Sequence, residues 1–85
     1  MPVAITLDAS ELEPPQPFDQ ARDILQNMQQ GQYLRMLHRR IPYPLFEYCK
    51  AMSLHYSVIE GSDPAYQIIM YFPGDEQALR QEGVL

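Results

Sequence analysis

Apolar and polar positions alternate along the chain in a way that divides it into short elements. From Val3 to Leu7 apolar residues take every second position, the period of a half-buried strand. After Pro17 the apolar positions recur at helical spacing, so we expect a helix that starts there and stops at Gly31. The apolar residues of this helix are Phe18, Ala21, Ile24, Leu25 and Met28.

The rest of the chain continues this alternation. Tyr33 to Leu37 predict a second strand, which cannot run through Pro42 and Pro44 because proline lacks the amide donor that a sheet requires. Pro44 suits the first turn of a helix, and the apolar stripe behind it predicts a second helix of about ten residues. Two further strands, His55–Glu60 and Tyr66–Phe72, are joined by a turn of Gly, Ser, Asp and Pro.

The predicted order is therefore strand, helix, strand, helix, strand, strand. This order indicates an α/β (α+β) two-layer sandwich, in which a mixed sheet of four strands carries both helices on one face. We expect a single domain over residues 1–73. Residues 74–85 contain helix formers without an apolar stripe, so we expect a weakly helical or disordered tail.

Composition narrows the class of protein. With 85 residues, 46% hydrophobic and 20% charged, the chain suits one ordinary globular domain. The formal net charge of -5 argues against nucleic-acid binding, which needs a basic surface. No apolar run approaches the roughly 20 residues that span a bilayer, and no basic stretch precedes an apolar run at the start. We therefore expect a cytoplasmic protein with no membrane partner.

Basic side chains concentrate in the middle of the chain. Arg35, Arg39, Arg40 and Lys50 are four of the six basic residues, whereas the first part of the chain is acidic. Such a charge distribution can orient a partner electrostatically. It is also what an unevenly charged, solvated surface looks like, and charge runs usually signal exposure.

The stretch from Leu7 to Phe18, LDASELEPPQPF, resembles a known functional motif that has lost its one reactive residue. Small sulfur-relay proteins of the TusA/SirA-like family open with a strand, the pattern Leu-Asp-x-x-x-Leu-x-Cys-Pro-x-Pro, and then a helix. Pro14 stands where that cysteine would be. The positions that keep the pattern are Leu7, Asp8, Leu12, Pro15 and Pro17.

The chain is most similar to a branch of that superfamily known only as a domain of unknown function. Members of the branch carry Pro-Pro-x-Pro in place of Cys-Pro-x-Pro, and a His followed by a Pro-x-Pro-Leu-like turn. Here that turn reads HRRIPYPL, from His38 to Leu45. The resemblance spans about Ile5 to Phe72 and implies the SirA-like fold, whose element order is the one predicted above.

Loss of the cysteine removes the chemistry that the family resemblance would imply. A sulfur carrier needs a thiol that becomes a persulfide, and Pro14 has neither sulfur nor an N–H group. The neighbouring prolines also remove amide donors that would bind an anion at the start of a helix. The EPPQP segment keeps its rigidity, which either sets the turn or provides a pre-organised contact surface.

We therefore expect a non-catalytic binding or adaptor module with a protein partner and no cofactor. Arg39, Arg40 and Tyr43 supply the charge and aromatic area favoured at binding hot spots. If Ile68 and Met70 face the helices, Ile69 and Tyr71 point away from them, and the opposite phase would exchange these residues. Either phase leaves an open apolar sheet face and favours a homodimer. The candidate contact residues are Asp8, Leu12, Pro14, Pro15, Pro17, His38, Arg39, Arg40, Pro42, Tyr43 and Pro44.

Two other classes of function stay open. Cys49 is the only thiol, and its phase with Leu45 and Met52 predicts burial as a core residue. If it were reactive instead, sulfur transfer or redox chemistry would follow. His38 and His55 are the only imidazoles, and they would hold a metal or haem if the strand ends that carry them lay close together.

Overall fold

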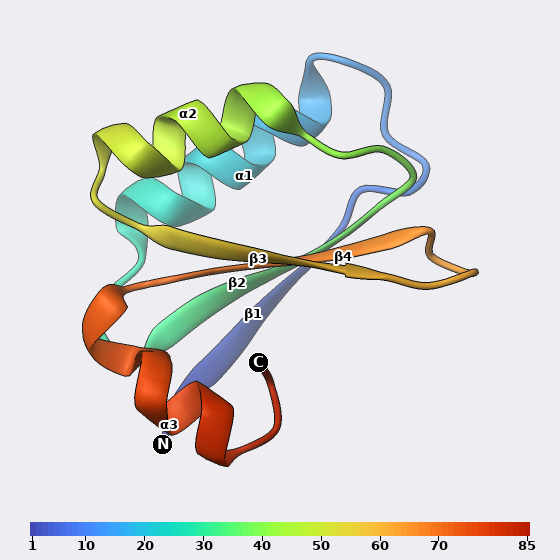
Figure 1. Cartoon of the computed structure of the whole chain (residues 1–85). Coiled ribbons are helices and arrows are strands. Elements are labelled where there is room, and N and C mark those ends of the chain that lie inside the picture. The colour runs from blue at the N-terminus through green and yellow to red at the C-terminus, as the bar shows by residue number, and fades with distance from the viewer.

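A mixed sheet covered by helices forms the body of the protein, which the computed structural model describes over residues 1–85 (Figure 1). No helix combines the length and apolar character that crossing a bilayer would require. In chain order the elements are β1 (Val3–Asp8), α1 (Gln16–Asn27), β2 (Gln32–His38), α2 (Tyr43–Ala51), β3 (His55–Glu60), β4 (Tyr66–Tyr71), a 3-10 turn (Pro73–Asp75) and α3 (Glu76–Gln81).

The four strands lie in the order β1-β2-β4-β3. β1 and β2 are parallel, whereas β4 is antiparallel to both of its neighbours, so the predicted mixed sheet is confirmed. The N–H of Ala9 donates to the carbonyl oxygen of Leu37 at 2.7 Å and extends the parallel ladder past the end of β1. Because β1 and β2 run in the same direction, both leave the sheet at the same edge.

The main core lies between the sheet and the two helices α1 and α2, as predicted (Figure 1). In β4, Ile68 and Met70 point to this side and are fully buried, which is one of the two phases that this uniformly apolar strand left open. Both layers contribute to the core, and removal of their apolar surface from water is the main force that holds them together. Its buried residues are Ala9, Ala21, Leu25, Met28, Leu34, Met36, Leu45, Phe46, Cys49, Leu54, Ile68 and Met70.

Gly31 has a different role from the one predicted. α1 ends at Asn27, and the next residue, Met28, already has an extended backbone. Gly31 lies in the turn that enters β2, where its φ of 90° is in the left-handed region that favours glycine. Its N–H donates to Oδ2 of Asp75 at 2.8 Å, which ties this turn to the C-terminal segment.

The C-terminal segment is the main departure from the predicted fold. Instead of a weakly helical or disordered tail, it forms α3 on the sheet face opposite α1 and α2 (Figure 1). Leu79 of α3 is fully buried and packs with Tyr33, Ile69 and Tyr71 in a second, smaller core. The sequence did not indicate this arrangement because a single buried leucine in a short helix makes no periodic stripe.

A polar cluster at the start of α3 adds to these contacts. The carboxylate of Glu76 accepts hydrogen bonds from the hydroxyl of Tyr71 at 3.2 Å and from Nε of Arg80 at 3.3 Å, and His55 Nδ1 lies 3.4 Å away. The hydrogen bond to His55, followed by those to Tyr71 and Arg80, lowers the pKa of Glu76. The contacts of the Glu76 carboxylate with His55 and Arg80 are exposed to water, so they orient α3 more than they stabilise it.

The sheet face that was expected to be open is therefore covered over its most apolar part. Ile69 and Tyr71 do point away from α1 and α2, but α3 buries them. Beyond α3 the same face carries a hydrogen bond from Arg35 Nε to Gln67 Oε1 at 2.9 Å. Ile59, 39% exposed, is an apolar residue that remains accessible. A homodimer was expected because this face was thought to be open, and that premise was wrong. Self-association remains a prediction, without the support of an open apolar face.

The packing of α3 predicts a specific loss of stability. Leu79→Ala removes the side chain that fills the second core, and we expect a loss of about 2–5 kcal/mol in the free energy of unfolding. Gln77→Ala, in the same helix but exposed, is the matched control and should change stability by less than about 0.5 kcal/mol. Urea unfolding measures both variants. Equal stability of the two variants would show that α3 does not pack on the sheet.

Candidate functional site

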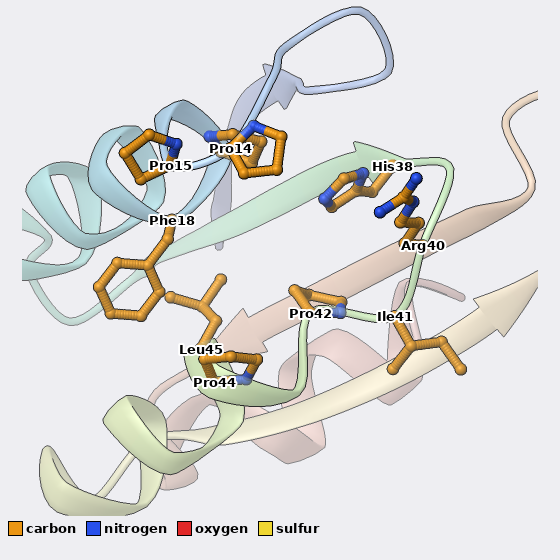
Figure 2. Close-up of a pocket in the computed structure, with 10 residues that line it drawn as sticks. Pro14, Pro15, Phe18, His38, Arg40, Ile41, Pro42, Pro44 and Leu45 are labelled. Carbon is orange, nitrogen blue, oxygen red and sulfur yellow. The ribbon is translucent and has the colours of Figure 1, made fainter.

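Two proline-bearing segments meet at the edge where β1 and β2 leave the sheet (Figure 2). One segment, residues 14–18, enters α1, and the other, residues 38–45, leads from β2 into α2. They enclose a cavity of about 310 Å³, which we call the proline cavity. Its lining residues are Pro14, Pro15, Pro17, Phe18, His38, Arg40, Ile41, Pro42, Pro44 and Leu45.

The walls of the proline cavity are rigid and mostly apolar. Five of the ten lining residues are prolines, whose rings fix the backbone φ angle. Pro15 and Pro42 precede α1 and α2, and neither helix has a side chain that caps its first turn. The positive ends of both helix dipoles therefore lie at this edge of the sheet. A ligand would meet a surface that needs little ordering before it binds.

His38 lies beside Arg40 at one end of the cavity (Figure 2). Nδ1 of its ring accepts a hydrogen bond from the backbone N–H of Arg39 at 2.9 Å, so the neutral ring carries its proton on Nε2. Partial burial, and then the positive charges of Arg39 and Arg40, lower the pKa of His38. The imidazole is therefore neutral at pH 7 and offers Nε2–H as a hydrogen-bond donor.

Arg39 and Arg40 are cations without an ion-pair partner. No carboxylate oxygen lies within 4.0 Å of either guanidinium group, whereas Lys50 and Arg80 each pair with a glutamate. Arg40 lines the proline cavity itself, and Arg39 lines a neighbouring recess of about 280 Å³. The residues around that recess are Leu12, Glu13, Pro14, His38, Arg39 and Arg40.

Four of the predicted contact residues lie outside the proline cavity: Leu12 and Arg39 line the neighbouring recess, and Asp8 and Tyr43 line neither. Oδ1 of Asp8 accepts a hydrogen bond from the N–H of Ser10 at 3.0 Å, which lowers the pKa of Asp8 and shapes the start of the loop. Asp8, which keeps the family pattern, therefore stabilises this turn. Tyr43, 66% exposed, borders a separate recess on the outer side of α2, beside the stacked rings of Phe46 and Tyr56.

Cys49 is a core residue, as its helical phase predicted. Its side chain is fully buried between α2 and the sheet. Burial raises the pKa of the thiol to about 11, so it stays protonated at neutral pH. The group is thus neither accessible nor ionised, as an attacking thiolate must be.

The two histidines do not share a site. His38 pairs with Tyr66 and His55 with Tyr71, at opposite ends of β4. Tyr66 and Tyr71 are five residues apart in the strand, which corresponds to about 16 Å. A metal bound at Nε2 of His38 would need the ring proton on Nδ1, which would break the hydrogen bond from Arg39. No group of three or more His, Cys, Asp or Glu side chains is placed to hold a metal ion.

Sequence reasoning missed three lining residues, Phe18, Ile41 and Leu45. Phe18 had been assigned only to the apolar stripe of its helix, and Leu45 to the stripe of its helix and to the HRRIPYPL turn, without being named as a contact residue. A signal for both exists in the sequence, because residues 15–18 read PQPF and residues 42–45 read PYPL. In both segments the first proline precedes the helix and the second occupies its first turn. This shared Pro-x-Pro-apolar pattern marks the two walls of one cavity.

Comparison with known proteins identifies a family without a function. Residues 6–69 match the model of a family described as uncharacterized conserved protein (DUF2249), and the chain belongs to that family. No curated protein and no solved structure matches the chain. The matched range contains both segments of the proline cavity and ends before α3.

The surroundings of His38 predict its titration. We expect a pKa below 6.5, and we expect Arg40→Gln to move it upward because one neighbouring positive charge is lost. Since the unfolded chain binds the proton more readily, stability from neutral His38 is present above pH 6.5 and is lost as pH falls through the folded pKa. NMR titration of the ring measures the pKa. Arg35→Gln is the distant control, and a His38 pKa above 6.5 in the unaltered protein contradicts this prediction.

Burial of Cys49 predicts an unreactive thiol. We expect no labelling by the thiol reagent DTNB in the native protein and complete labelling in guanidinium chloride, with Cys49→Ser as the blank. Incubation with a cysteine desulfurase and its substrate should likewise add no sulfur to the intact mass. Rapid native labelling, or a sulfur adduct that is lost in Cys49→Ser, would make sulfur transfer the better account of this protein.

Proposed function

We propose that this member of the DUF2249 family is a non-catalytic binding module that holds a segment of a cytoplasmic partner protein in the proline cavity. One observation carries the proposal. The EPPQP turn and the HRRIPYPL segment, each singled out from the sequence as a contact surface, line the same cavity. Its volume of about 310 Å³ is at the lower end of the range for ligand sites, which suits one or two side chains of a partner.

The chemistry of the lining favours recognition over catalysis. The lining residues include no serine, threonine, cysteine, lysine or carboxylate, so His38 is the only lining side chain that could act as a nucleophile or a base. Nδ1 of His38 accepts a hydrogen bond from a backbone N–H, and no carboxylate orients the ring as a general base. What remains are rigid apolar walls, one cation and one hydrogen-bond donor, which are the elements of a selective binding surface.

We further propose that the family is a branch of the TusA/SirA-like superfamily in which the sulfur-carrying position has become a contact position. Pro14, which stands where that cysteine would be, lines both the proline cavity and the recess beside it. The only thiol of the chain is in the core instead. In this proposal the surface that once presented a thiol to partner proteins still meets a partner, but no longer transfers sulfur.

Removal of Arg39 and Arg40, the unpaired arginines next to the proline cavity, tests the proposal. With a photo-reactive benzoylphenylalanine in place of Tyr43, which is exposed and lies between the lining residues Pro42 and Pro44 in the sequence, we expect a covalent adduct with a discrete partner protein in cells. Arg39→Ala together with Arg40→Ala should reduce the adduct at least about tenfold, because desolvated arginines are frequent hot spots. Mass spectrometry identifies the partner and gel analysis measures the yield.

A second pair of substitutions controls for loss of charge. Arg35→Ala with Arg80→Ala removes two positive charges outside both the proline cavity and the recess that Tyr43 borders, and should leave the adduct unchanged. Adduct formation that survives loss of Arg39 and Arg40, or that falls equally in both double variants, contradicts the proposed site. Circular dichroism of each purified variant verifies that the fold is retained.

A further inference from the structure

The proline cavity has two chemically different ends. His38 and Arg40 lie together at one end, and Phe18, Pro44 and Leu45 lie toward the other (Figure 2). The side chains at the first end offer only hydrogen-bond donors, because a guanidinium group has no acceptor and Nδ1 of His38 already accepts the N–H of Arg39. A ligand group that fills this end must therefore be an acceptor.

The electrostatics of this end favour an acceptor that carries a negative charge. Arg39 and Arg40 have no ion-pair partner, and no acidic residue lines the proline cavity. Glu13 borders the neighbouring recess but lies more than 4.0 Å from either guanidinium group. The positive ends of the α1 and α2 dipoles at the same edge add to the attraction.

The form of the anion follows from the donors that are present. A phosphate site at the start of a helix uses several free backbone N–H groups, and here Pro17 and Pro44 in the first turns remove such donors. A guanidinium group can form two parallel hydrogen bonds with either anion, and Nε2–H of His38 supplies one further donor, a small set that is enough for the two oxygens of a carboxylate. The available donors suit a carboxylate better than a phosphate.

The other end of the cavity selects an apolar group. The ring of Phe18 is held edge-on against Tyr48, with ring centroids 6.5 Å apart, and Pro44 and Leu45 complete an apolar wall. Within about 310 Å³, the carboxylate and the apolar group must belong to the same or adjacent residues of a ligand. The C-terminal residue of a protein carries both groups on a single Cα atom.

We infer that the proline cavity binds the C-terminal residue of a partner protein, with its carboxylate at Arg40 and His38 and an aromatic or large apolar side chain against Phe18 and Leu45. This inference rests on the proposed function and specifies which part of the partner is recognised. It assigns Arg40 the selection of the charge and Phe18 the selection of the side chain. An internal peptide segment, which lacks the terminal carboxylate, would bind weakly.

A matched pair of small probes tests the inference on the full chain. N-acetyl-L-phenylalanine presents a terminal carboxylate and an aromatic side chain, and N-acetyl-L-phenylalaninamide replaces the charge with an amide. In ¹⁵N–¹H NMR titrations we expect the acid to shift the amide signals of Phe18, Arg40, Ile41 and Leu45 saturably, with a millimolar Kd. The amide should bind at least about tenfold more weakly. A hydrogen bond to a charged group contributes more binding free energy than one to a neutral group, by about the amount that corresponds to this factor.

Two variants assign the effect to named groups. Arg40→Gln should reduce binding of the acid to the level of the amide, whereas Lys50→Gln, which removes one charge from the exposed side of α2, should leave binding unchanged. N-acetylglycine, which lacks the aromatic side chain, should bind more weakly than the acid. Signals away from the cavity that keep their positions in each variant verify an intact fold.

Each contrary outcome has a distinct meaning. Equal affinity of acid and amide, or an Arg40→Gln variant that binds the acid normally, overturns carboxylate selection but leaves a binding cavity and hence the proposed function. No shift at the cavity signals with either probe overturns the inference. If the photo-adduct then still depends on Arg39 and Arg40, the module recognises another part of its partner. If that dependence is absent as well, the proposed function fails with the inference.

Discussion

Parallel pairing of β1 with β2 is the constraint on which the rest of the structure depends. Two parallel strands must leave the sheet at the same edge, and each is followed by a helix on the same face. The starts of α1 and α2 are therefore brought together although they lie far apart in the sequence. With antiparallel strands the two proline-bearing segments would lie at opposite edges, and no proline cavity would form.

The same short pattern builds both walls of the cavity. In residues 15–18 and 42–45 a proline precedes the helix, a second proline occupies the first turn, and an apolar side chain follows it into the core. The prolines fix the entry of the chain into each helix, and Phe18 and Leu45 anchor it. The same residues thus set the fold and line the cavity: the segments that start the helices also form its walls.

Much of the fold can be predicted from local patterns, and most of the site cannot. The bounds of β3 and the burial of Cys49 follow from periodicity along short stretches, whereas the phase of β4 does not, because that strand is apolar on both faces. Convergence of the two segments depends on strand order and direction, which are set by contacts between residues distant in sequence. The packing of α3 was missed for a related reason, because Leu79 is one residue that matches a pocket formed by two strands. The opposite placement of His38 and His55 likewise required the register of β4.

Nuclear Overhauser effects in the free protein test the convergence of the two segments most directly. The rings of Phe18 in α1 and Tyr48 in α2 have centroids 6.5 Å apart, and Phe18 and Leu45 face the same cavity. We predict cross-peaks from the Phe18 ring protons to the Tyr48 ring and to the Leu45 methyl groups. Cross-peaks that connect Phe18 only with its own helix and with β1, and none with α2, would contradict a site built from both segments.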